Sequence, residues 1–413
     1  VTKDTMTALE DNLTRSEGHC MVMGTASTMA ACAEALGMML PGGASIPAPD
    51  SRRLRLASAT GKQAVHLARA GIKPSQIMTR EAFENAIRVL HALGGSTNAV
   101  VHLPAIAGRL GVELPLDLFD DLSRTTPWLA NLRPSGKFQM EQFFEAGGVP
   151  VLMKELEGLL NLDTMTVTGL TTGENLSQVV GTSTRDEASQ RRVREVIASA
   201  DAPLDPEGGL AILRGSLAPD GAVIKTVAAS PHLMKHRGRA LVFDSPTALQ
   251  AAADDLDLDV TPDDILVLQN AGPVGAPGMP EIGNLPIPRK LLRQGVRDMV
   301  RISDARMSGT AFGTIVLHVA PESAIGGPLA AVRTGDEIEI DVEARRIDLM
   351  VDPAEIARRL AERVPAPAPF RRGYGKLFVD HVMQAPDGCD FDFLRGDASD
   401  AVSAARMGRD MRT

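Results

Sequence analysis

The stretch from Leu266 to Gly313 restricts the possible folds of this chain more than any other. It reads as a short apolar strand, a loop rich in Gly and Pro, a helix, a second short strand, a polar loop and a third strand. The Gly and Pro residues of the first loop predict a bent backbone that approaches its neighbours closely. Because open α/β sheets build their ligand sites from loops that leave the same end of adjacent strands, we expect a site here.

The two predicted loops carry the residue types of a polar site. The first loop ends on an acid, Glu281, and the second presents the hydroxyls of Ser308 and Thr310 on either side of Gly309. The surroundings of Ser308 do not match a G-x-S-x-G hydrolase elbow, and no nucleotide-binding glycine motif follows a strand. With these motifs excluded, the residues suggest a reactive serine beside an acid that binds a metal ion. A nearby cation can stabilise the alkoxide form of such a serine. From the residues alone, a glycine-rich structural corner with a polar rim is an equal alternative.

Composition excludes several classes of partner. The 413 residues suggest two or three domains and carry a formal charge of −9, from 52 acidic and 43 basic side chains. An acidic chain argues against nucleic acid and anionic membranes as partners, and no apolar run approaches the ~20 residues of a membrane span. We also expect no signal peptide. Three widely spaced cysteines do not form a disulfide framework, so we expect a cytoplasmic protein whose thiols are available to metal.

The character of the sequence changes along the chain. Helical patterns dominate residues 1–200, apart from a short strand predicted at Met165–Thr168. Asp201–Gly209 has the composition of a linker, and short strands with two hairpins follow it. We therefore predict an α/β fold: a mostly helical, incomplete α/β domain at 1–200 and a β-barrel-like domain at 210–363. A proline-rich linker then leads into a C-terminal tail, so that 364–413 forms a third region.

Cys20 precedes a run of small residues, Gly24–Ala31, that predicts a closely packed helix. A thiol at or just before a helix N-terminus is favoured as a thiolate, whereas a lone cysteine is more often buried and inert. We interpret Cys32 and Cys389 as structural and assign no histidine a metal role. Gly94–Asn98 opens another helix, and its polar side chains serve either as ordinary caps or as part of a ligand site.

Five long motifs occur along the chain: EGHCMVMGTASTMAACAEALGMMLPGGA, GGSTNAVVHLPAIA, GPVGAPGMPEIGN, SDARMSGTAFG and RRGYGKLFVDHVMQAPDGCDFDFL. In these motifs and in their order the chain resembles the IlvD/Edd dehydratase family. That family contains dihydroxy-acid dehydratase, phosphogluconate dehydratase and the sugar-acid dehydratases. The last two motifs resemble the sugar-acid branch more than the branched-chain amino-acid branch.

The resemblance implies dehydration of a sugar acid (aldonate) to a 2-keto-3-deoxy acid. It implies an iron–sulfur cluster, [2Fe–2S] in preference to [4Fe–4S], with Cys20 as one of three cysteine ligands, and Mg²⁺ with Glu281 as a ligand. Ser308 would act as the base in its alkoxide form, and Thr310 would hydrogen-bond to Ser308 or to the substrate. The implied partners are a small-molecule substrate and further copies of the chain, in a homodimer or homotetramer.

In the family the EGHC-type motif follows an N-terminal region with two further cluster cysteines. We therefore expect this chain to be the C-terminal part of a longer enzyme. Asp304 and Arg306 flank the proposed base, and we interpret them as a local ion pair. Two alternatives stay open: a dihydroxy-acid dehydratase of branched-chain amino-acid biosynthesis, and an inactive fragment that lacks the N-terminal ligands.

Overall fold

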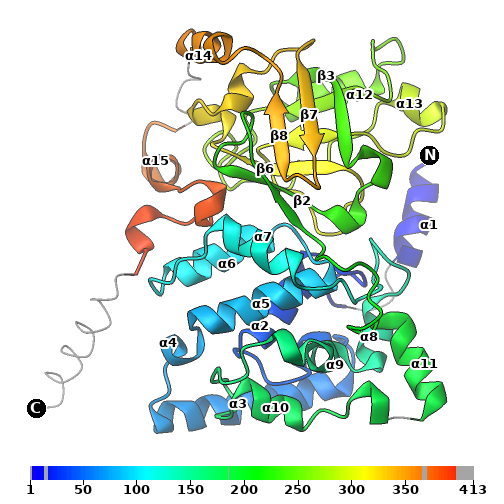
Figure 1. The fold of residues 1–413 in the computed structure, drawn as a ribbon, viewed down its shortest axis with the longest axis vertical. Coiled ribbons are helices and arrows are strands. Elements are labelled where there is room, and N and C mark those ends of the chain that lie inside the picture. Colours follow the sequence, from blue (N-terminus) through cyan, green and yellow to red (C-terminus); the bar gives the residue numbers. More distant parts are fainter. Residues whose placement is uncertain (1, 14–16, 185, 365–369, 397–413) are drawn as a thin grey trace, which may run out of the picture. The chain divides into compact units, whose positions relative to one another are not determined.

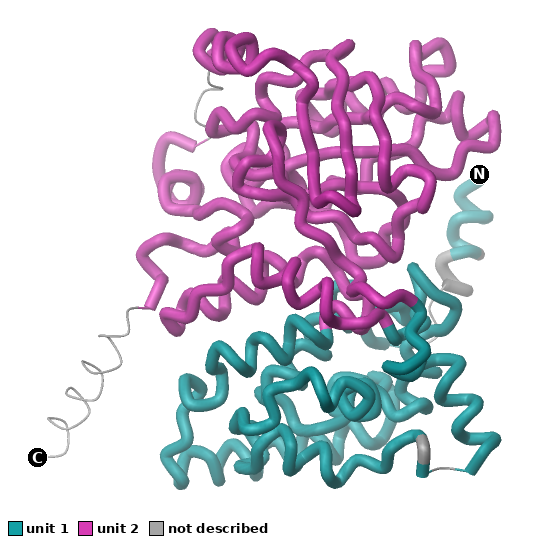
Figure 2. Tube along the Cα trace, viewed as in Figure 1, with its two compact units in different colours: residues 1–89, 129–204 teal, residues 90–128, 205–413 magenta. Residues whose placement is uncertain are grey.

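The computed structural model describes residues 2–13, 17–184, 186–364 and 370–396 (Figure 1). The chain divides into two compact units, each made of two segments (Figure 2). Unit 1 comprises residues 1–89 and 129–204, and unit 2 comprises residues 90–128 and 205–413. The proline-rich linker at 365–369 and the end of the predicted tail, 397–413, lie outside the described residues.

Unit 1 is helical, and its described residues form no β-strand. Its helices are α1 (Lys3–Leu13), α2 (Thr25–Ala35), α3 (Ser51–Ala70), α4 (Pro74–Ile77), α5 (Arg80–Leu93), α8 (Met140–Ala146), α9 (Gly148–Glu155), α10 (Thr172–Ser177) and α11 (Glu187–Val196). The last residues of α5, 90–93, belong to unit 2. The predicted small-residue helix is α2, in which Ala31, Cys32 and Ala35 are buried because short side chains let neighbouring segments approach closely.

The strand predicted at Met165–Thr168 is wrong. The segment forms a turn in which Thr166 N donates to Leu170 O at 3.0 Å, and only Met165 makes an isolated β-bridge. Thr166 Oγ1 also donates to Leu170 O at 2.9 Å and accepts from Asn175 Nδ2 at 2.9 Å. Threonine hydroxyls that bond nearby backbone groups compete with a strand ladder, and this effect outweighs the β-propensity of threonine here.

Unit 2 contains an eight-stranded sheet that almost closes on itself, in the order β1-β2-β6-β5-β4-β3-β7-β8. Its strands are β1 (Ala211–Leu213), β2 (Gly221–Ile224), β3 (Lys235–Phe243), β4 (Ile265–Leu268), β5 (Arg301–Ser303), β6 (Ile315–Ala320), β7 (Glu337–Asp341) and β8 (Arg346–Leu349). Neighbours among β3, β4, β5 and β6 pair in parallel, and the other pairs are antiparallel. Just after β1, Arg214 forms hydrogen bonds of 3.0 Å with Arg345 O and Ile347 N at β8. This contact joins the two ends of the sheet and confirms the predicted β-barrel-like architecture.

The described part of unit 2 also contains six α-helices, two of which begin with a side-chain cap. They are α6 (Ala99–Gly108), α7 (Leu116–Arg124), α12 (Pro246–Asp254), α13 (Arg289–Arg293), α14 (Pro353–Ala361) and α15 (Gly373–His381). Ser245 Oγ accepts from Ala248 N at 3.3 Å to cap α12, and Asp352 Oδ1 accepts from Ala354 N at 2.8 Å to cap α14. Within the described ranges, no helix combines the length and apolar character that a bilayer-spanning segment needs.

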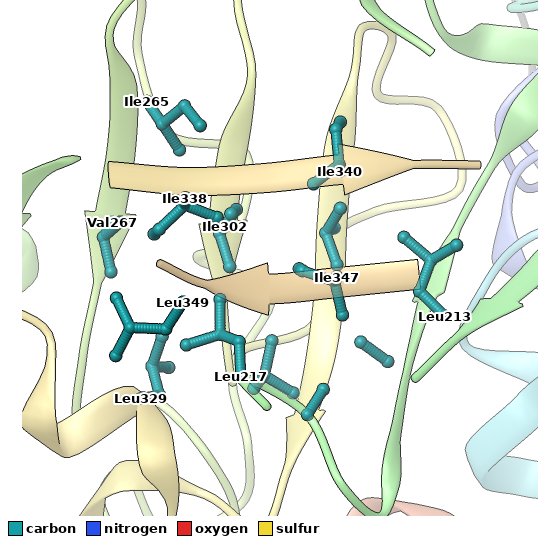
Figure 3. Packing of buried hydrophobic residues seen from close by; sticks show 14 of the residues in the cluster. Leu213, Leu217, Ile265, Val267, Ile302, Leu329, Ile338, Ile340, Ile347 and Leu349 are labelled. Carbon is teal, nitrogen blue, oxygen red and sulfur yellow. The ribbon is translucent and has the colours of Figure 1, made fainter. Parts of the chain in front are cut away.

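Branched aliphatic side chains fill the inside of the barrel. Figure 3 shows residues from β4, β5, β7 and β8 meeting there, among them Ile302, Ile338 and Ile347. In β4, Val267 joins this interior cluster, whereas Leu266 joins a second cluster that includes residues of α12 and α13. Since β4 is covered on both faces, it is a continuous apolar run, and each such side chain contributes about 1.5–3 kcal/mol by burial.

Candidate functional site

The parallel strands β4 and β5 place the two predicted loops at one edge of the sheet. Their register sets Leu268 at the end of β4 opposite Ser303 at the end of β5. The glycine-proline loop after β4 and the polar loop after β5 therefore leave the same end of neighbouring strands, as the sequence predicted. The chain returns through β6, which also pairs in parallel with β5.

Asn98 connects the two loops. Its buried side-chain amide donates to the Glu281 carboxylate of the first loop and, at 3.1 Å, to the Met307 carbonyl of the second. Glu281 is exposed and directly follows the segment of Gly and Pro residues, while Met307 directly precedes Ser308. The carboxylate and the hydroxyls predicted as site residues are thus brought together within unit 2, and the GGSTNA segment supplies the bridge between them.

Two polar groups of Thr310 lie beside the Ser308 hydroxyl, the side-chain hydroxyl and the backbone N–H. Ser308 Oγ lies 2.9 Å from Thr310 Oγ1, and the Thr310 backbone N–H donates to Ser308 Oγ at 3.4 Å. Ser308 is half-buried and Thr310 is exposed, so a small molecule can reach both hydroxyls. Donors aimed at one oxygen stabilise negative charge on it, and this arrangement suits a serine that releases its proton.

The ion pair predicted between Asp304 and Arg306 is wrong. Asp304 is buried, and its carboxylate accepts from Ala271 N and Ser323 N at 2.9 Å each. Arg306 instead reaches the first loop, where its Nε donates to Met279 O at 2.6 Å. Backbone N–H groups can stabilise a buried carboxylate in place of a cation. For Asp304, segments that follow the neighbouring strands provide those N–H groups. Burial raises the pKa of Asp304, although these hydrogen bonds oppose the change.

A second acid, Glu322, holds the backbone of the first loop. Its carboxylate accepts from Val274 N at 2.9 Å and from Gly275 N at 2.8 Å, and Gln384 of the tail donates to it at 2.8 Å. A Cβ atom on Gly272 would stand 2.7 Å from the Glu322 side chain. Glycine is therefore required for this close approach, as the composition of the loop predicted.

Arg301 holds the far ends of both loops. Its guanidinium donates to Leu285 O at 3.1 Å, after the first loop, and to Phe312 O at 3.3 Å, after the second. It also pairs with Asp298 at 3.0 Å, and both side chains are almost completely buried. One side chain at the start of β5 thus fixes the spacing between the segments that carry Glu281 and Ser308.

Two histidines lie near these loops in an uncharged state. Burial lowers the pKa of His102; the positive charge of Arg306 lowers it further and Glu281 raises it. Burial also lowers the pKa of His318 to about 3, with smaller contributions from Arg306 and His102. Both imidazoles are therefore neutral near pH 7, and neither adds positive charge to the site.

Cys20 lies in unit 1, whereas Glu281, Ser308 and Thr310 lie in unit 2. Its thiol is exposed and lines a hollow of about 180 Å³, together with residues that include Glu17, His19 and Arg53. The helix that follows, α2, begins at Thr25, so Cys20 lies in the loop before this helix, five residues ahead of its first residue.

The other two cysteines are poor ligands. Cys32 is completely buried, its Sγ lies 3.7 Å from Ala86 O, and burial raises its pKa to about 12. Burial likewise raises the pKa of Cys389 to about 12, and its Sγ lies 3.4 Å from Met279 Sδ. Among the described cysteines, Cys20 alone offers an exposed thiol.

The donors present suit part of a metal site. Within the described residues, no three His, Cys, Asp or Glu side chains gather closely enough to hold a metal ion. Glu281 is nevertheless an exposed, hard oxygen donor, and Mg²⁺ commonly binds one or two carboxylates while substrate oxygens and water complete its shell. The exposed thiol of Cys20 in turn suits an iron–sulfur cluster as one of its ligands.

Comparison with known proteins identifies the family. Residues 1–175 match the N-terminal model, and residues 195–389 the C-terminal model, of the dihydroxy-acid/6-phosphogluconate dehydratases. The chain is 50% identical over 395 residues to L-arabinonate dehydratase of Rhizobium leguminosarum bv. trifolii, covering 95% of this chain and 66% of that protein. It is 53% identical over 396 residues to L-arabonate dehydratase of Azospirillum brasilense (94% and 66%).

A third relative carries a different name. Dihydroxy-acid dehydratase of Acidothermus cellulolyticus is 44% identical over 391 residues, covering 94% of this chain and 67% of that protein. The chain thus spans about two thirds (66%) of the length of the relatives named L-arabinonate and L-arabonate dehydratase. Both halves of the match agree with the predicted resemblance, and the chain belongs to the IlvD/Edd dehydratase family.

Proposed function

We propose that the protein is a hydro-lyase that converts an aldonate to a 2-keto-3-deoxy acid and water. The observation that carries the proposal is the Asn98 bridge, which sets an exposed carboxylate, Glu281, beside the loop of Ser308 and Thr310. The higher identity to proteins named L-arabinonate and L-arabonate dehydratase, 50% and 53% against 44%, favours a sugar acid over a branched-chain acid.

Ser308 is the proposed base. Its Oγ takes the proton from C2 of the substrate while the hydroxyl group leaves from C3, and the proton and hydroxide together account for the water released. The resulting enol rearranges to the 2-keto acid as C3 gains a proton. Thr310 Oγ1 and the Thr310 N–H lie within hydrogen-bonding range of the same oxygen and would stabilise its alkoxide form before the substrate proton is taken.

The two cofactors have separate roles in this proposal. When bound, Mg²⁺ would supply positive charge for the substrate carboxylate and 2-hydroxyl, and an iron–sulfur cluster would supply Lewis acidity for the 3-hydroxyl. Glu281 would hold the Mg²⁺, and Cys20 would be one of three cluster ligands, with [2Fe–2S] as the proposed cluster type. We also propose a homodimer or homotetramer as the assembly.

The test uses the full-length protein, purified without oxygen and supplied with iron, sulfide and Mg²⁺. L-arabinonate, D-gluconate, 6-phosphogluconate and 2,3-dihydroxyisovalerate are offered separately, and formation of 2-keto acid is followed. We expect turnover of the unphosphorylated aldonates. Preference for 2,3-dihydroxyisovalerate would assign the protein a branched-chain acid as its substrate. Absence of any keto acid from the cluster-loaded protein would refute the dehydratase activity.

Ser308→Ala tests the base directly. Removing a general base lowers turnover by roughly 10²–10⁴-fold, so we expect kcat to fall by that factor. The visible absorbance of the cluster should stay unchanged, because Ser308 is not proposed as a ligand. Turnover close to that of the natural protein would exclude Ser308 as the base.

A further inference from the structure

Lys225 is a buried lysine directly after β2 that the proposed mechanism does not use. Only 1% of its surface is exposed, and it ranks among the largest fully buried side chains of the chain. Burial lowers its pKa to about 7, and among the described residues no carboxylate raises it again. Burying a lysine without a counter-charge destabilises the fold. Its contact with the loop of Ser308 offers a functional reason for a lysine at this position.

The amino group of Lys225 meets the loop of the proposed base. Its Nζ donates to the carbonyl oxygen of Gly309 at 3.4 Å. That carbonyl belongs to the same peptide group as the Thr310 N–H, and the Thr310 N–H donates to Ser308 Oγ at 3.4 Å. In a planar trans peptide the C=O and N–H bonds point in opposite directions, so one flat group connects Lys225 to Ser308.

Hydrogen bonds that follow one another through a peptide group strengthen each other. A donor at the carbonyl oxygen draws electron density towards that oxygen and makes the N–H of the same group a better donor. Lys225 therefore acts on Ser308 Oγ without touching it. The effect is greatest when the oxygen carries negative charge, that is, when the serine is an alkoxide.

The backbone holds Lys225 in this position. β2 pairs with β6 so that Ile224 stands opposite Val316, and Lys225 follows directly. Beyond it, Ala228 O accepts from Gly313 N at 2.9 Å, which joins the segment after Lys225 to the end of the Ser308 loop. Lys225 follows β2 and the Ser308 loop leads into β6, and because these two strands pair, the sheet sets the spacing between the lysine and the loop.

We propose that Lys225 is a positioning residue for Ser308, which orients and polarises the Gly309–Thr310 peptide so that its N–H stabilises the serine alkoxide. This inference rests on the proposed function, in which Ser308 takes the C2 proton. Lys225 itself neither gives nor takes a proton in the reaction. Its removal raises the barrier to proton abstraction and leaves substrate binding unchanged.

Lys225→Met tests this role, because methionine fills the space of the aliphatic stem and removes the donor. The matched control is Lys290→Met: Lys290 Nζ also donates to a backbone carbonyl, Leu258 O at 2.8 Å, but in a different part of unit 2. Both variants are measured in the full-length, cluster-loaded protein with an aldonate that carries either hydrogen or deuterium at C2. The readouts are kcat, KM, the isotope effect on kcat, the iron content and Tm.

For Lys225→Met we expect kcat to fall by about 10–100-fold, somewhat less than the loss of a direct oxyanion donor. KM and iron content should stay unchanged, and the isotope effect should rise because proton abstraction becomes more rate-limiting. Lys290→Met should leave all kinetic values unchanged. A lysine that only fills space would change Tm alone, so an unaltered kcat and isotope effect in Lys225→Met would overturn the inference.

If Lys225→Met does not fold, Lys225→Gln decides on the same criteria, since glutamine keeps a polar but shorter side chain. Ser308→Ala, measured alongside, separates this inference from the proposed function. Loss of turnover in Ser308→Ala together with normal kinetics in Lys225→Met overturns only the role of Lys225. Normal turnover in Ser308→Ala overturns both.

Discussion

Arg301→Met removes the guanidinium that fixes both site loops, and its effect follows from the burial of the pair. The side chains of Arg301 and Asp298 are 4% and 5% exposed and lie 3.0 Å apart. Methionine keeps an unbranched side chain but offers no donor. The Asp298 carboxylate then stays buried without its counter-charge, and the carbonyls of Leu285 and Phe312 lose a donor.

Removing one partner of a buried ion pair lowers the free energy of unfolding by about 3–5 kcal/mol. For a domain of a few hundred residues, where 1 kcal/mol shifts Tm by ~2–4 °C, the expected decrease is on the order of 10 °C. An exposed pair offers the control: Arg289 and Asp254 lie 3.4 Å apart with side chains 57% and 52% exposed. Arg289→Met should cost about 0–1 kcal/mol.

The pH dependence gives the prediction a sign. Burial alone would raise the pKa of Asp298, but hydrogen bonds from Ser230 and Thr314 and the charge of Arg301 hold it below its usual value. In the natural protein this lowered pKa contributes stability above the unfolded pKa, and the contribution is lost as pH falls through the folded pKa. Without Arg301 the pKa of Asp298 rises, so the carboxyl is neutralised at a higher pH. The difference in stability between the two proteins should therefore shrink from pH 7 towards pH 4.

Thermal unfolding of the natural protein, Arg301→Met and Arg289→Met, followed by circular dichroism from pH 4 to pH 8, measures both effects. A Tm within 2 °C of the natural protein for Arg301→Met at pH 7 would refute the reasoning. A difference that is constant across the pH range would show that the loss comes from packing and the freed carbonyls, not from the unpaired carboxylate.

Three further changes test the site and the helical unit. Asn98→Ala removes the amide that joins the two site loops, and we expect kcat to fall by about 10–100-fold through misplacement, with Tm as the check that the protein is folded. Cys20→Ser should remove iron and the visible absorbance of the cluster, whereas Cys32→Ser should keep both; equal iron in the two variants would contradict the ligand role of Cys20. Burial raises the pKa of Glu34 to about 7, so its contribution to stability falls as pH rises from about 4.5 to about 7, and Glu34→Gln should flatten Tm across that interval.

The strands of unit 2 were predictable because burial leaves a direct mark on sequence. β4 and β6 are apolar runs, and the hairpin strands β7 and β8 alternate, since one of their faces meets the interior cluster. For the second short strand of the stretch from Leu266 to Gly313, the sequence pattern predicts Asp298–Ile302, whereas β5 begins three residues later, at Arg301. Asp298 uses its side chain to accept from Thr314 N at 3.0 Å and from Thr314 Oγ1 at 2.8 Å, so it anchors a loop and the strand begins only at Arg301.

The site was predictable as a pair of loops but not as a set of contacts. Ser308, Thr310 and Glu281 stand out by residue type within their loops, whereas Asn98 lies 183 positions before Glu281 and forms its bridge only through the fold. Lys225 carries no local signal either, because a single lysine after an apolar run is typical of a strand that ends at the surface. Side chains that act across the barrel are specified by strand order, which periodicity does not reveal.

Asp304 has a consequence for how the protein can change. It follows β5, and its carboxylate binds the backbone of Ala271 after β4 and of Ser323 after β6, so a single side chain ties three parallel strands at one edge. Its partners there are the two backbone N–H groups and the Ser323 hydroxyl, so the tie involves no side chain of the loop from 273 to 283. A combinatorial library over that loop that keeps Glu281, Gly275 and Gly283 fixed is therefore expected to alter the range of ligands accepted while the barrel beneath it keeps its stability.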